Sequence, residues 1–162
     1  MQTEKRTIAN DILFAEVTRE LEAGKKVTIP VKGNSMYPFI LDGRDTVVLE
    51  KAAAYSTGDI VLFDIDGRYI LHRLVCIEDG IATMAGDGNL GTIERCPAGN
   101  IHGKAVSILK NSVSGVSGRK HSIDPTSKNE LRKVALWNSL KPFRRIILGV
   151  LRRIPRSGLR RY

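Results

Sequence analysis

Apolar and polar residues alternate along several short segments of the chain, and Gly, Asp and Asn stand between these segments. β-branched residues are common within them, and this combination is typical of half-buried strands. Asp66-Gly67 falls between two segments and predicts a tight hairpin turn. No alternation of strands with helices is present, so the pattern predicts a mainly β fold. The predicted strands are Val27–Val31, Thr46–Glu50, Asp59–Ile65, Tyr69–Ile77, Ile81–Met84 and Lys104–Leu109.

Segments with helical spacing flank this β region. Residues 7–23 predict an amphipathic helix that packs on the body and ends near Gly24. From about Asn129 onward, apolar residues return at three- and four-residue steps among many Lys and Arg, and Pro142 should kink or split this second helix. The expected division is a β domain with its N-terminal helix over 1–110, a flexible Ser/Gly-rich linker over 111–127, and a basic amphipathic helical tail over 128–162.

Charge is distributed unevenly between these parts. The chain carries a formal net charge of +9, of which residues 128–162 contribute +10 and residues 1–127 contribute −1. A partner of opposite charge should therefore meet the tail. A basic amphipathic helix with a tryptophan favours an anionic membrane surface; packing on the body or on a partner is the alternative, and nucleic acid ranks last because no recognition module precedes the body. The predicted membrane-binding residues are Trp137, Lys141, Phe143, Arg144 and Arg145.

The apolar runs and the cysteines restrict the remaining possibilities. No run is long enough for a signal peptide or a spanning helix, which predicts a cytoplasmic protein located peripherally at the inner face of the membrane. Cys76 and Cys96 lack metal-ligand spacing, so no metal and no cofactor is expected. His102 and His121 fall in loop-like stretches and are expected to be solvated.

One serine lies in a stretch suited to a nucleophile. Gly33 allows a backbone conformation that side chains disfavour, and Pro38 restricts the backbone after Ser35. His72 lies inside an apolar strand pattern, and Asp87 lies in a Gly-rich turn. Serine, histidine and aspartate are the side chains of nucleophilic acyl transfer, in which the histidine accepts the serine proton.

Four motifs follow one another along the chain: Gly33-Asn34-Ser35-Met36-Tyr37-Pro38, Gly58-Asp59-Ile60-Val61, His72-Arg73 and Gly86-Asp87-Gly88-Asn89. In this order they resemble the signal peptidase and LexA-like serine peptidase superfamily. The resemblance covers roughly Lys25–Leu109, and it implies that superfamily's folded antiparallel sheet. The His-Arg motif is similar to the branch with a histidine base, as in signal peptidases of the endoplasmic-reticulum and archaeal type, whereas other members use lysine.

The resemblance implies Ser35 as nucleophile and His72 as base. Asp87 is the first candidate to orient His72. Histidine-type signal peptidases carry a further acid shortly after the Gly-Asp-x-Asn motif, where this chain has Ile93 followed by Glu94, so Glu94 is the second candidate.

The residues around the serine should supply the oxyanion hole and the substrate groove. Gly33 offers no hydroxyl, so backbone N–H groups in the turn with Asn34 and Met36 are expected to serve. Met36, Tyr37 and Phe39 are candidates for the groove wall, although core packing explains them equally well.

These observations together predict a serine endopeptidase that cleaves a peptide or protein, with a leader peptide as one candidate. The alternatives are a catalytically inactive peptidase-like module that docks through its basic tail, and a LexA-like regulatory autopeptidase.

Overall fold

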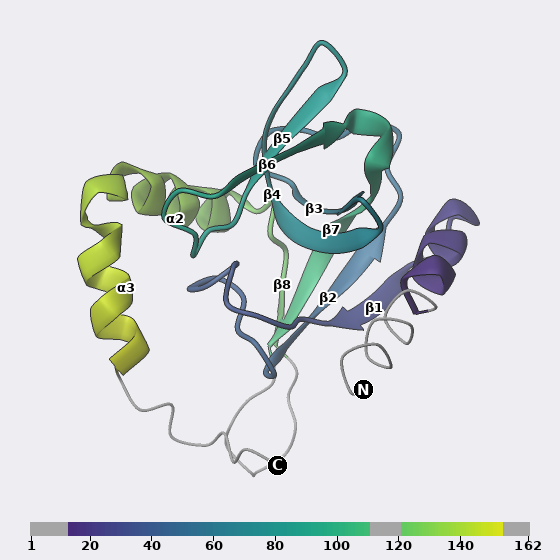
Figure 1. Ribbon diagram of the computed structural model, residues 1–162. Coiled ribbons are helices and arrows are strands. Elements are labelled where there is room, and N and C mark those ends of the chain that lie inside the picture. Colours follow the sequence, from purple (N-terminus) through teal and green to yellow (C-terminus); the bar gives the residue numbers. More distant parts are fainter. Residues whose placement is uncertain (1–12, 111–120, 154–162) are drawn as a thin grey trace, which may run out of the picture.

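A curled antiparallel sheet forms the body of the protein (Figure 1). The computed structural model describes residues 13–110 and 121–153. Within these residues the strand order is β1-β2-β7-β3-β4-β5-β6, and β8 pairs with β7, so β1 is an edge strand. The strands are β1 (Val27–Pro30), β2 (Asp45–Glu50), β3 (Ile60–Ile65), β4 (Arg68–Glu78), β5 (Ile81–Ala85), β6 (Ile93–Pro97), β7 (Ile101–Lys110) and β8 (His121–Ile123), with a short 3-10 helix η1 (Ala98–Asn100) before β7.

The mainly β prediction is confirmed, and all six predicted strands are present with small shifts at their ends. Two strands were not predicted. β6 carries charged residues and ends at Pro97. It is the other edge strand of the sheet, and an edge strand tolerates proline because the missing N–H can face away from the neighbouring strand. β8 is short and polar, and it lies within the predicted linker.

Two-residue turns connect β3 to β4, where the Asp66-Gly67 turn was predicted, and β4 to β5, where no turn was predicted. Asp66 and Gly67 both have positive φ, +51° and +76°, between β3 and β4. Asp79 and Gly80 repeat this geometry, with φ of +49° and +77°, between β4 and β5. Positive φ at both central residues matches the twist of the flanking strands, so these turns fix the register of β3, β4 and β5.

Alternate residues of β3 enter two different hydrophobic clusters. Ile60 and Leu62 belong to the cluster that also holds the N-terminal helix, whereas Val61 and Phe63 belong to the other. Successive strand residues point to opposite faces, so the two clusters lie on opposite faces of β3. Residues 13–22 are helical, as predicted, and residues 7–12 of that prediction lie outside the described residues.

The C-terminal segment forms two helices that pack on the body. They are α2 (Lys128–Ser139) and α3 (Arg144–Arg153), separated by the 3-10 turn η2 (Lys141–Phe143), so the predicted split at Pro142 is confirmed. Ser127, from the end of the predicted linker, caps α2 by accepting a hydrogen bond from the Glu130 N–H. Residues 111–120 of that linker lie outside the described residues. No helix in the described residues has the length and apolar character needed to cross a bilayer.

Candidate functional site

Ser35 lies on the loop between β1 and β2, whose main chain is closed by its own hydrogen bonds. Gly33 has a φ of +86°, as its predicted role requires. The Tyr37 N–H donates to Asn34 O over 3.2 Å, and the Ile40 N–H donates to Met36 O over 3.0 Å. The Tyr37–Pro38 peptide is cis. Ser35 itself is partly exposed on this turn.

The buried carboxylate of Asp45 stabilises the end of this loop that leads into β2. Asp45 accepts hydrogen bonds from the Leu41 N–H over 2.9 Å and from the Arg44 guanidinium, and Lys110 lies 3.2 Å away. Lys110 also donates to Phe39 O. Burial would raise the pKa of the Asp45 carboxyl, but these hydrogen bonds and positive charges together hold it below its ordinary value. The turn before β2 is therefore held by contacts that stabilise the fold.

His72 lies on β4 with its two ring nitrogens in different surroundings. Nδ1 is 2.9 Å from Glu94 Oε2, which lies on β6. Nε2 faces Gly86, where a Cβ would lie 3.0 Å from it. The His72 side chain is buried, and Glu94 is 16% exposed, so the carboxylate is positioned to fix the tautomer with the proton on Nδ1. That tautomer leaves Nε2 free to accept a proton.

The turn at 86–89 lies between His72 and Ser35. A Cβ on Gly86 would lie only 2.5 Å from Ser35 O, and a Cβ on Gly88 would lie 2.6 Å from Asn34 O. The Gly88 N–H donates to Ser35 O over 2.7 Å. Only glycine permits such close approach to another main chain, so these two glycines bring the Ser35 main chain next to the histidine.

Asp87 does not take the role expected from the sequence. Its two carboxylate oxygens accept from Arg73 Nε and Nη2 over 3.0 and 2.8 Å, and both side chains are buried. Arg73 also donates to Gly58 O over 2.7 Å. In an antiparallel ladder successive residues of β4 face opposite sides, so the histidine and the arginine need different carboxylates. Glu94 takes the position beside His72 that was expected for Asp87.

The hydroxyl of Ser35 and the N–H groups beside it have no partner within the described residues. No hydrogen bond joins Ser35 Oγ to His72 there, and the N–H groups of Ser35 and Met36 donate to no acceptor. Catalytic hydrogen bonds are often long before a substrate binds. Unused N–H donors next to a nucleophile are the groups that an oxyanion hole requires.

An apolar cavity adjoins the strand that leads into Ser35. It has a volume of about 250 Å³. Met36, Tyr37 and Phe39, the candidate wall residues, do not line it; Met36 is part of the core, and Tyr37 packs against the C-terminal helices. The lining residues are Leu13, Phe14, Ile29, Pro30, Val31, Lys32, Leu62, Tyr69 and Leu71.

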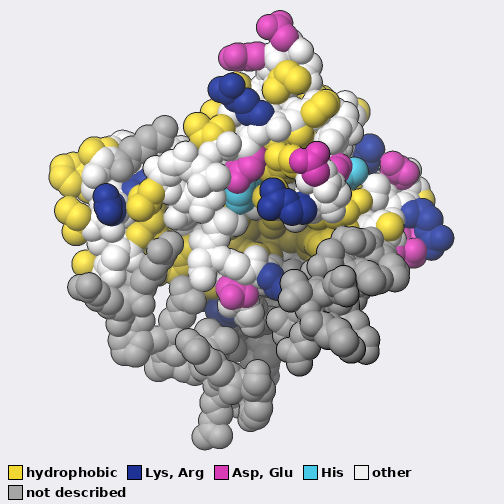
Figure 2. Space-filling model, in the orientation of Figure 1, with side chains coloured by type: hydrophobic (Ala, Val, Ile, Leu, Met, Phe, Trp, Pro, Cys, Tyr) yellow, Lys and Arg dark blue, Asp and Glu magenta, His cyan; other side chains and the backbone are white. Residues whose placement is uncertain are grey.

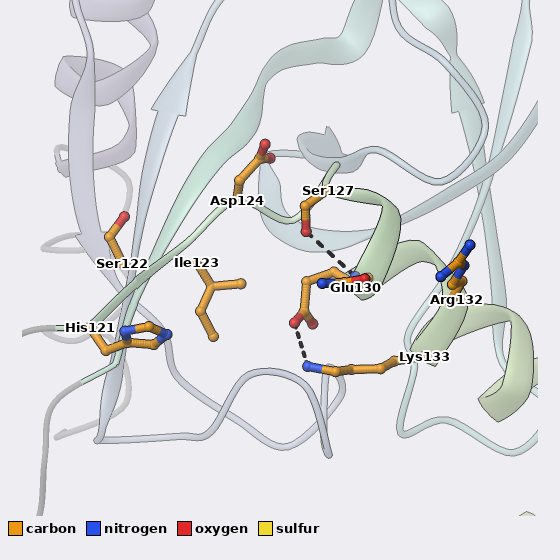
Figure 3. Close-up of a pocket in the computed structure, with 9 residues that line it drawn as sticks. His121, Ser122, Ile123, Asp124, Ser127, Glu130, Arg132 and Lys133 are labelled. Atoms are coloured by element: carbon orange, nitrogen blue, oxygen red, sulfur yellow. Dashed lines mark hydrogen bonds and ion pairs between the residues drawn. The ribbon is translucent and has the colours of Figure 1, made fainter.

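A larger concavity of about 540 Å³ lies between β8 and α2 (Figure 3). Its lining is polar, and the contacts in it are structural: Lys133 donates to Glu130 over 2.5 Å, next to the Ser127 cap. His121 is exposed at its rim, as expected. His102 differs from its prediction, because it lies in β7 and its Nε2 is 2.9 Å from Asp64 Oδ1. No residue of the Ser35 site lines this concavity.

Two of the predicted membrane-binding residues are buried against the body. Trp137 is 7% exposed and its Nε1–H donates to Asp87 O over 2.8 Å. Arg144 is also 7% exposed, donates to Trp137 O over 3.0 Å, and lies over the indole ring. Neither side chain is available to a membrane in this arrangement. Phe143 and Arg145 are exposed, and the side chain of Lys141 lies outside the description.

Comparison with known proteins identifies a family for this chain. A family model described as Peptidase S24-like matches residues 3–106, which include Ser35, His72, Asp87 and Glu94. No curated protein matches the chain. The match extends over more than half of the sequence and over the whole of the site, and the chain therefore belongs to the Peptidase S24-like family.

Proposed function

We propose that the protein is a serine endopeptidase in which Ser35 is the nucleophile, His72 the general base and Glu94 the group that orients the histidine. The observation that carries this proposal is the position of His72, with Nδ1 2.9 Å from Glu94 and Nε2 next to the turn that binds the Ser35 main chain. Membership of a peptidase family supports a hydrolase of this type. The histidine base is the finer assignment, and it rests on this geometry.

The chemistry follows from these positions. His72 Nε2 accepts the Ser35 proton as Oγ attacks the substrate carbonyl carbon, and the N–H groups of Ser35 and Met36 stabilise the resulting oxyanion. The imidazolium, held by Glu94, then donates its proton to the leaving amine, and an acyl-enzyme remains. Water, deprotonated by the same histidine, releases the acyl group and restores the serine.

An extended peptide fits the surface that leads to Ser35. β1 is an edge strand among the described strands, so its free side can pair with a substrate strand. The apolar cavity beside Ile29, Val31 and Tyr69 would receive an aliphatic side chain of that strand. We therefore propose an unfolded segment, such as the leader of a small peptide, as the substrate.

The test is cleavage of a diverse peptide mixture, with new termini identified by mass spectrometry. The wild-type protein should generate termini that share an aliphatic residue close to the cleaved bond, and Ser35→Ala should generate none. Equal cleavage by both proteins would overturn the proposal. Binding of peptides without cleavage would instead favour an inactive peptidase-like module, an alternative supported by the absence of a Ser35–His72 hydrogen bond in the described residues.

We also propose that the outer face of α3 attaches the protein to an anionic membrane surface. Phe143, at the end of η2, and Ile146 and Val150, in α3, follow helical spacing and are 57, 69 and 55% exposed. Apolar side chains gather along this outer edge of the molecule (Figure 2). Arg145 is exposed on the same helix, and residues 128–162 carry a net charge of +10, which complements anionic lipid.

Vesicle flotation tests this attachment without disturbing the body. The full chain should float with vesicles that contain phosphatidylglycerol. With vesicles of phosphatidylcholine alone it should stay unbound at the bottom of the gradient. The double variant Phe143→Ser, Ile146→Ser should lose flotation with an unchanged melting temperature, because both side chains are exposed. Equal flotation of the variant and the wild type would exclude this face as the attachment site.

A further inference from the structure

α2 contacts the two turns that hold Arg73. The Leu131 side chain lies over Gly58, where a Cβ would be 3.7 Å from Leu131 Cδ2, and Trp137 donates to Asp87 O over 2.8 Å. Gly58 O and the Asp87 carboxylate are the two acceptors of the buried Arg73 guanidinium. α2 and α3 follow the part of the chain that the family model matches, which ends at residue 106. An element outside the family match therefore contacts the site.

One peptide group transmits this contact to the nucleophile. The carbonyl of Asp87 accepts from Trp137, and the N–H of the same peptide, which belongs to Gly88, donates to Ser35 O over 2.7 Å. A peptide unit is planar, so the direction of its carbonyl determines the direction of its N–H. Hydrogen bonds in series also strengthen one another. The indole thus holds the peptide that positions the Ser35 main chain.

The aromatic surroundings hold the indole in this orientation. Trp137 meets the Phe39 ring edge to face, with centroids 6.4 Å apart, and it clusters with Tyr37 and Leu148. Arg144, which belongs to α3, lies over the indole ring with its Cζ 5.1 Å from the ring centroid. Burial lowers the pKa of the Arg144 guanidinium, and the negative charge of Asp87 acts in the opposite direction. Tyr37 and Phe39 belong to the Ser35 loop, so Trp137 contacts this loop as well as the turn at 86–89.

We propose that Trp137 is a positioning residue of the active site, which acts through the Asp87–Gly88 peptide on Ser35. The C-terminal helices are then a working part of the enzyme. This inference rests on the proposed role of Ser35 as nucleophile.

The test compares Trp137→Phe, which retains a ring and removes the N–H donor, with Val134→Ala, which shortens another buried residue of α2 outside the aromatic cluster. Two quantities are measured: the amide exchange rate of Gly88 relative to amides of β3, and the rate at which a fluorophosphonate acylates Ser35. Trp137→Phe should raise the relative exchange rate about tenfold and lower the acylation rate about fivefold, as expected for loss of one hydrogen bond. Val134→Ala should lower the melting temperature and leave both quantities unchanged.

Unchanged Gly88 exchange in Trp137→Phe would overturn the inference, whatever the acylation rate. Faster exchange with an unchanged acylation rate would overturn the positioning role. If the wild-type protein is not acylated at all, the proposed function fails, and the exchange rate alone still decides whether Trp137 holds this peptide.

Discussion

At the scale of single residues, the motifs led to the side chains that the structure brings together, but not to their pairing. Ser35, His72 and the Gly86–Asn89 turn converge, as their order along the chain indicated. The partner of His72 is Glu94 rather than Asp87, because strand alternation turns His72 and Arg73 toward different carboxylates. A linear motif indicates which turn lies near the histidine, and only the sheet register decides which side chain meets it.

Substitution of the two acids separates their roles. Glu94→Gln should preserve the fold and lower the turnover number about 100-fold or more, because the histidine loses the group that fixes its tautomer and stabilises its charged form. Asp87→Asn should instead lower the free energy of unfolding by about 3 kcal/mol. The amide keeps one acceptor oxygen but loses the negative charge, so the buried Arg73 guanidinium loses its counter-ion. Turnover and melting temperature of both variants decide the assignment. An Asp87→Asn protein that melts like the wild type but has lost activity would contradict it.

The lowered pKa of Asp45 predicts how the stability of the protein depends on pH. Its pKa is lower in the folded protein than the ordinary value of 3.8, so its contribution is complete above that value and disappears as the pH falls through the lowered one. Asp45→Asn should therefore be less stable than the wild type near neutral pH, and the difference should shrink as the pH falls below about 4. Melting temperatures across this range measure it. A difference that stays constant with pH would show that the Asp45 charge contributes nothing.

At the scale of elements, the sequence pattern was sufficient for strands with one buried face, such as β2, and for β3, which is buried on both faces. It failed for β6 and β8, where charged or polar residues and the sheet edge remove the apolar signal. The glycines at 86 and 88 were sufficient to predict a turn from the sequence. Their actual function, which is to let two main chains approach within hydrogen-bond distance, depends on tertiary contacts that no local pattern contains.

Alanine substitutions in this region should have opposite outcomes according to the space available. Gly88→Ala places a Cβ 2.6 Å from Asn34 O and 2.8 Å from Tyr37 O, so the turn must move away from the Ser35 loop and activity should fall at least tenfold. Gly91→Ala meets nothing within 4 Å and should retain wild-type activity. Turnover of a common peptide substrate provides the comparison. Comparable activity of the two variants would mean that the turn does not position Ser35.

At the scale of the whole molecule, the C-terminal helices are attached to the body through buried contacts. Periodicity predicted the helices, but it did not predict which side chains are buried: Arg144 is buried beside Trp137, whereas apolar Ile146 and Val150 are exposed. Trp137, Leu148 and Arg144 face the Ser35 loop, whereas Phe143 and Ile146 face outward. The same helices therefore carry both the contact to the site and the proposed membrane face.

Truncation after Thr126 tests this attachment. Removal of the helices would expose Tyr37 and Phe39 and deprive Asp87 O of its donor, so the truncated chain should melt at a lower temperature and bind a hydrophobic dye. Differential scanning calorimetry and dye fluorescence measure both effects. A truncated chain with an unchanged melting temperature and no dye binding would show that the helices contribute nothing to the body.

The central claim is that Ser35 is a nucleophile activated by His72, and intact-mass spectrometry after exposure to a fluorophosphonate or a peptide aldehyde tests it most directly. The wild-type protein should gain the mass of one bound probe, and peptide mapping of the fluorophosphonate adduct should place it on Ser35. Ser35→Ala should gain none, and His72→Ala should react at least 100 times more slowly, as expected when a general base is removed. Labelling of Ser35→Ala at the wild-type rate, or labelling that does not depend on His72, would contradict the account.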